Sequence, residues 1–80
     1  MTRNVAIRRR LNPTKLIEAR LAAGITTQAE MAKRIGMTRM RYGYWERAQP
    51  PVKFDFHLMS ALLQELNVSF DDISDVLEAG

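Results

Sequence analysis

Residues 27–46 constrain the fold more than any other segment, because they contain two helix starts separated by a single glycine. Thr27 and Glu30 match the capping-box pattern, in which a Thr hydroxyl and a Glu carboxylate satisfy the free amides of a helix start. The helix that begins there should end at Gly36, since glycine readily takes the left-handed conformation that closes a helix. Thr38 is a second N-cap. The segment therefore predicts two short helices joined by a tight turn.

Cap residues and apolar residues at helical spacing predict three more helices. Asn12-Pro13 starts one that runs to about residue 23, and Asp55 precedes another over 56–67. Ser69 starts a last helix that continues to about residue 77. The residues expected to point inward include Leu16, Met31, Ala32, Ile35, Met37, Tyr42, Trp45, Phe56, Met59, Leu62, Leu63 and Leu66. Strand signals are absent, so the prediction is an all-α, five-helix fold.

Two parts of the chain are distinguished by composition. Residues 1–11 contain four arginines and no helix start, so they are expected to form a basic N-terminal arm. Leu11 could instead pack against the core. Residues 12–80 should form a single domain with a small core, given a total length of 80 residues.

Charge is divided unevenly along the sequence. All 12 Lys and Arg residues lie within residues 1–53, together with three acidic residues. Residues 54–80 carry six acidic residues and no basic residue, so the net charge is +9 in the first part and −6 in the second. The first part should attract a polyanion, and the second should be turned away from it.

Several classes of function lack their usual residues. The chain has no Cys, which excludes disulfides and thiol catalysis and makes a cytoplasmic location the default. No apolar run is long enough to span a membrane. His57 has no companion ligands at metal-site spacing, and no serine has a base in a recognisable arrangement. We therefore expect no metal, no cofactor and no enzymatic activity.

Four short motifs, in order and at matching spacing, resemble the phage-repressor helix-turn-helix family, the lambda-repressor-like or Cro-like (XRE-like) DNA-binding domain. They are Gln28, Met31-Ala32, Ile35-Gly36-Met37-Thr38 and Trp45-Glu46. The resemblance extends over roughly residues 16–73. It implies that double-stranded DNA is the partner, in a bacterial or phage-infected cell, and that a recognition helix over 38–48 enters the major groove.

The same resemblance implies roles for individual residues. Gln28 should touch a DNA phosphate and brace the first residues of the recognition helix. Arg20 and Glu46 match a structural ion pair. Arg41 and Arg47 are candidates for contacts with the DNA backbone or with nearby bases. The positions that match those facing base edges are Thr38, Arg39, Met40 and Tyr44.

Elementary chemistry supports some of these roles and leaves alternatives open. Arg39 has the fork geometry to bind guanine O6 and N7 together, or it is an ordinary solvated arginine. Met40 could lie against a thymine methyl group, or it is an exposed filler. Tyr44 could contact a base or a phosphate, or pack against the following loop. Gly43 could let the helix backbone approach the groove floor, or it allows close packing within the protein.

Other aromatic and basic residues are interpreted more simply. The spacing of Tyr42 and Trp45 places them on the core face of the recognition helix, so base stacking is not expected. Phosphate contacts are also expected from the arm and from the loop after the recognition helix, with solvated surface charges as the alternative. These candidates are Arg8, Arg9, Arg10 and Lys53.

A homodimer is expected, because one recognition helix contacts few base pairs and this class of protein binds two half-sites one helical turn apart. The acidic second part has more apolar residues than a small core obviously needs. The dimer interface is predicted there, and the alternative is that these residues close the core of one chain. They are Leu66, Val68, Phe70, Ile73, Val76 and Leu77.

The sequence therefore predicts a sequence-specific transcriptional regulator, with a repressor of a palindromic operator as the leading hypothesis. One alternative is an antitoxin-type autoregulator of a toxin–antitoxin pair, whose protein partner would cover the acidic C-terminal half. Another is a protein-interaction adaptor that keeps the fold without binding DNA.

Overall fold

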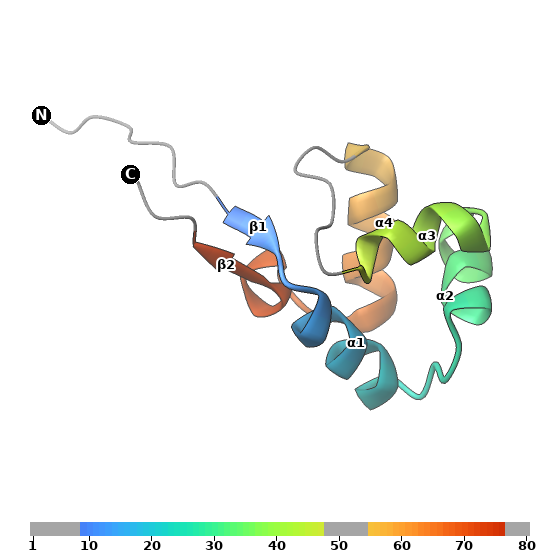
Figure 1. The fold of residues 1–80 in the computed structure, drawn as a ribbon, viewed down its shortest axis with the longest axis horizontal. Coiled ribbons are helices and arrows are strands. Elements are labelled where there is room, and N and C mark those ends of the chain that lie inside the picture. The colour runs from blue at the N-terminus through green and yellow to red at the C-terminus, as the bar shows by residue number, and fades with distance from the viewer. Residues whose placement is uncertain (1–8, 48–54, 77–80) are drawn as a thin grey trace, which may run out of the picture.

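Four α-helices and a small two-stranded sheet make up the part of the chain that the computed structural model describes, residues 9–47 and 55–76. The helices are α1 (Pro13–Ala22), α2 (Gln28–Ile35), α3 (Arg39–Trp45) and α4 (Phe56–Leu66). A 3₁₀ turn, η1 (Phe70–Ile73), follows α4 and leads into β2 (Ser74–Val76), which pairs with β1 (Arg9–Leu11). The sheet lies at the opposite end of the domain from α2 and α3 (Figure 1).

The predicted helix starts are confirmed by their cap contacts. The side-chain oxygens of Asn12, Thr27 and Thr38 accept the backbone amide three residues later, at 3.0, 3.1 and 3.2 Å. The Asp55 carboxylate accepts two amides at the start of α4, at 2.8 and 3.1 Å. Gly36 has a φ of 79°, which closes the turn between α2 and α3 as expected. Local signals therefore position both helices of the central motif.

The core is formed by one face of each helix and by the turn between α2 and α3. The fully buried side chains include Leu16 from α1, Met31 from α2, Tyr42 from α3 and Leu62 from α4.

The prediction that Phe56 points inward is wrong, because this residue is 78% exposed. Phe56 is the first residue of α4, and the buried stripe of that helix begins one turn later at Met59. Its spacing is helical, but at that position no core surface covers it.

The predicted fifth helix is wrong in type. Only four residues after Ser69 form a helical turn, and the chain then becomes extended as β2. The Ser74 side chain explains the change: it is fully buried, and its hydroxyl donates to the Phe70 carbonyl at 2.6 Å and accepts from Arg9 Nε at 2.7 Å. Both contacts hold the backbone where it meets β1.

The predicted boundary at residue 11 also needs correction, because Arg9–Leu11 belongs to the folded domain. Leu11 is 1% exposed and lies in the core, which was the alternative for this residue. Asn12 joins the two chain segments: its amide donates to the Ile73 carbonyl at 2.8 Å and its side chain donates to Asp75 at 2.6 Å. Residues 1–8 lie outside the described residues.

Leu11→Ala tests whether β1 is part of the domain. Truncating this buried side chain should lower the free energy of unfolding by about 2–5 kcal/mol, because it leaves a cavity beneath the sheet. Urea unfolding followed by circular dichroism measures the change. Leu21→Ala is the matched control, since Leu21 is 52% exposed and its loss should change stability by about 0.5 kcal/mol or less. Equal, small effects of both changes would show that β1 is not held in the core.

Candidate nucleic-acid interface

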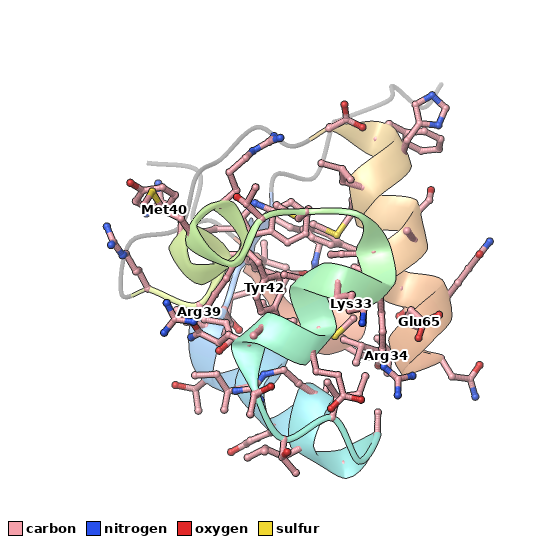
Figure 2. All side chains as sticks on the ribbon, turned by 90° about the vertical axis from the view of Figure 1, so that its right-hand side faces the viewer. Lys33, Arg34, Arg39, Met40, Tyr42 and Glu65 are labelled. Atoms are coloured by element: carbon pink, nitrogen blue, oxygen red, sulfur yellow. The ribbon has the colours of Figure 1, made fainter. Side chains whose placement is uncertain are left out.

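The helix pair α2–α3 presents one side of α3 to solvent and the other to the core. Figure 2 shows Arg39 and Met40 pointing away from the domain, and Tyr42 pointing into it. Tyr42 is fully buried, and its ring lies 6.1 Å from that of Trp45. Met40 is 69% exposed and Tyr44 is 43% exposed. The two buried aromatic residues thus fix which residues of α3 face outward.

A buried carboxylate holds α3 against α1. Glu46, the residue that ends α3, accepts from Arg20 Nε at 2.8 Å and from a second Arg20 nitrogen at 3.2 Å. The guanidinium also donates to the Ile25 carbonyl at 3.0 Å, which fixes the chain between α1 and α2. Tyr42 donates its hydroxyl to the same carboxylate. The ion pair that the family resemblance implied is therefore present, with a third group attached to it.

Gln28 joins this network from the start of α2. Its side-chain nitrogen donates to Glu46 at 2.9 Å, so Gln28 braces the end of α3. The resemblance had implied that it braces the beginning of this helix. The Gln28 side-chain oxygen lies against Gly43, where an added Cβ would come within 3.3 Å of it. A larger residue at this position would require the Gln28 amide to shift by a few tenths of an ångström, which supports the close-packing alternative. A closer approach of α3 to a groove remains a prediction.

Burial and the bonds to Glu46 shift two pKa values in this network. The hydrogen bond to Glu46 is the main cause of a raised pKa of the Arg20 guanidinium, against a smaller opposing effect of burial. Burial is the main cause of a strongly raised pKa of the Tyr42 phenol, and the bond to Glu46 adds to it. A charged Arg20 and a neutral Tyr42 therefore surround Glu46 through the physiological pH range.

Three exposed arginines, two on α3 and one just after its end, have no acidic partner within residues 9–47 and 55–76. The guanidinium groups of Arg39 and Arg41 make no hydrogen bond or ion pair with the residues that the structure describes. The Arg47 guanidinium lies over the Tyr44 ring, 4.2 Å from its centre, in a cation–π contact. The single acidic residue between 38 and 47 is the buried Glu46. This face of α3 is consequently basic.

An open hollow of about 370 Å³ lies beside this face. Its floor includes the bare backbone of Gly43, and it extends from α3 to the start of α2. The residues that line it are Gln28, Arg39, Met40, Gly43, Glu46 and Arg47. Five of these six were selected from the sequence as DNA-contacting candidates, and Glu46 as part of the ion pair. Thr38, at the start of α3, is exposed.

The basic residues of β1 are placed differently from those of α3. Arg9 donates to Ser74 at 2.7 Å and lies 3.4 Å from the Asp71 carboxylate. Arg10 is exposed on the same strand, at the far end of the domain from α3 (Figure 1). Arg9 thus has a structural role that the sequence did not indicate. Arg8 and Lys53, also predicted to contact phosphates, lie outside the described residues.

The predicted dimer residues divide into two groups. Leu66 and Ile73 are 6% and 0% exposed, so they close the core of one chain, as the alternative had it. Val68 and Phe70 are half-buried against that core, and Val76 is 57% exposed. Leu77 lies outside the described residues. The side chains left for an interface are therefore fewer than the sequence suggested.

The acidic second part is also less free than its composition indicates. Asp75 pairs with Lys15 at 2.8 Å, and the hydrogen bonds from Lys15 and Asn12 lower the pKa of its carboxyl. Asp71 pairs with Arg9, and Glu65 with Arg34 at 3.3 Å. These ion pairs within the chain therefore leave fewer unpaired carboxylates for a protein partner to bind.

Neither a metal centre nor a membrane span is found within residues 9–47 and 55–76. No three His, Asp or Glu side chains there are grouped so as to hold a metal ion. None of the helices is long and apolar enough to cross a bilayer.

Comparison with known proteins gives the class of the chain. The model of the helix-turn-helix family matches residues 16–73, which is most of the sequence. The chain belongs to this family, the XRE or lambda-repressor-like helix-turn-helix proteins, which are DNA-binding regulators. Searches of curated proteins and of solved structures gave no match. The family match coincides with the extent that the four sequence motifs predicted.

Removal of the Glu46 carboxylate tests the buried network. Glu46→Ala should lower the free energy of unfolding by about 3–5 kcal/mol, because Arg20 is left buried without a counter-charge. Arg20→Ala should have a similar cost, and the double variant should lose clearly less than the sum of the two. Chemical unfolding of the four proteins gives the coupling free energy. Additive losses would mean that the two groups do not interact.

Alkaline pH tests the environment of Tyr42. A raised pKa in the folded state gives stability that is fully present below the unfolded pKa, about 10, and is lost as the pH rises above it. Between pH 9 and 11 the free energy of unfolding should fall more steeply in the wild type than in Tyr42→Phe. The difference in slope should approach about 1.4 kcal/mol per pH unit. Parallel curves would contradict the burial of the phenol.

Proposed function

We propose that the chain is a sequence-specific transcriptional regulator that binds double-stranded DNA by inserting α3 into the major groove. The observation that carries the proposal is the unpaired basic face of α3. Arg39, Arg41 and Arg47 have no carboxylate partner in the described part of the chain, whereas Arg34 on α2 forms ion pairs with Glu30 and Glu65. Phosphates would supply the missing negative charge on both sides of a groove.

Within this proposal the residues divide by role. Arg39 would bind a guanine edge through its two-pronged guanidinium, with Thr38, Met40, Gly43 and Tyr44 at neighbouring base edges. The phosphate contacts would come from either side of the same face and fix the register of α3 on the duplex. These candidates are Arg41, Arg47 and Gln28, whose amide also holds Glu46.

The finer parts of the proposal are a homodimer, a palindromic operator and repression in the cytoplasm. One α3 helix has only seven residues, so two copies on a two-fold site would give the specificity that one lacks. Val68, Phe70 and Val76 would form the dimer contact, since they are the described members of the predicted interface that the core buries only in part or leaves exposed. A repressor acts by occupying such a site, and it needs no further active group.

Arg39→Ala is the direct test of the proposed role of α3. The probe is a duplex selected from a random DNA pool with the full chain, and binding is followed by fluorescence anisotropy. The variant should bind this duplex about 5- to 150-fold more weakly, since a bidentate arginine–guanine pair gives about 1–3 kcal/mol of discrimination. Arg34→Ala is the matched control, because it removes the same charge from an arginine that is already paired. It should retain most of the affinity.

Duplex enrichment and salt dependence together separate DNA binding from the adaptor alternative. The logarithm of the affinity should fall linearly with the logarithm of the salt concentration, as phosphate contacts release counterions. A chain that keeps the fold as a protein-interaction adaptor would enrich no duplex from the pool. An antitoxin-type autoregulator would enrich one, and its protein partner would have to bind a surface where Asp71 and Asp75 are already paired.

A further inference from the structure

Met40 and Tyr44 form a small apolar stripe in the middle of the basic face. Five large apolar side chains are strongly exposed in the described part of the chain, and these two lie one helical turn apart on α3. Both are held outward because Tyr42 and Trp45 occupy the inner side of the same helix. An apolar stripe of this kind is not solvated well and gains free energy when another apolar group covers it.

The major groove contains one kind of apolar group that this stripe could meet. The base pairs present hydrogen-bond donors and acceptors in this groove, and the one strongly apolar group among them is the methyl group on C5 of thymine. Cytosine has hydrogen at the same carbon unless it is methylated. Thymine and 5-methylcytosine therefore present the same apolar group at the same place in the groove.

The surroundings of the stripe suit a methyl group beside a guanine. Gly43, between Met40 and Tyr44, has no side chain to fill the adjacent hollow, and Gln28 blocks its inner side. Arg39 lies next to Met40 at one edge of the stripe and is free to reach a neighbouring base (Figure 2). Arg47 is held over the Tyr44 ring at the other edge. The stripe thus has an arginine at each edge, and its Met40 part borders the open hollow.

We propose that Met40 and Tyr44 recognise the C5-methyl group of a pyrimidine in the major groove. The site would accept thymine or 5-methylcytosine and would disfavour unmethylated cytosine at the same position. DNA binding by this chain would then respond to cytosine methylation in its operator. This inference rests on the proposed function, since it specifies which bases the same face of α3 prefers.

Removal of single methyl groups from the DNA is the test. The probe is again the duplex selected from a random pool by the full chain, with each thymine replaced in turn by deoxyuridine. At one or more positions the affinity should fall about three- to fivefold, the effect of one buried methyl group. Replacement of the same base pair by cytosine–guanine should weaken binding, and 5-methylcytosine there should bind about three- to fivefold more tightly than cytosine. The first arm reports thymine and the second reports 5-methylcytosine.

Protein variants assign the effect to the stripe. Met40→Ala should abolish the response to deoxyuridine, and Met40→Leu should keep it because an apolar side chain of similar size remains. Leu21→Ala, which truncates an exposed leucine of α1, should leave the response unchanged. Thermal unfolding should show that all three variants fold, since both residues are exposed.

The outcomes distinguish this inference from the proposed function. A duplex that is bound with equal affinity after every deoxyuridine replacement would overturn the inference and leave DNA binding intact. A response that persists in Met40→Ala would also overturn it. Failure of the full chain to enrich any duplex would remove the proposed function and the inference together.

Discussion

The buried Glu46 carboxylate is the interaction on which the rest of the structure depends. It accepts four hydrogen bonds, two from Arg20 in α1, one from Gln28 in α2 and one from Tyr42 in α3. One anion therefore sets the relative positions of three helices. Because it lies on the inner side of α3, it fixes the outer side mainly through the buried Arg20 and Tyr42. Gln28 is the partner at the edge of this network, where it also lines the open hollow beside α3.

The arginines of this small domain divide into two populations with different roles. Arg9, Arg20 and Arg34 pair with carboxylates and hold distant segments together. Arg39 and Arg41 have no such partner among the described residues, and they lie on one short helix. A basic chain needs this division, because arginines that are neutralised within the fold contribute little to the attraction of a polyanion. Net charge alone would have assigned all of them the same role.

The sequence predicts the parts of this structure that depend on neighbouring residues. The caps at Asn12, Thr27 and Thr38 and the turn at Gly36 involve residues within a few positions of one another, so their chemistry is readable directly. The pairing of β1 with β2 joins segments more than sixty residues apart, and each strand has three residues, too few to show an alternating pattern. The packing of Gln28 against Gly43 likewise depends on how α2 and α3 cross. Such contacts cannot be predicted from the residues that are neighbours in the sequence.

The two-stranded sheet has a consequence for how this domain is joined to anything else. Arg9 and Val76 are opposite each other in the β1–β2 ladder, so the polypeptide enters and leaves the domain at neighbouring points. Those points lie across the molecule from α3 (Figure 1). A fluorescent protein or a sensor module joined directly at residue 9 or residue 76 would emerge on the side away from α3. A short linker between these two points would also allow circular permutation, with new ends opened elsewhere on the surface.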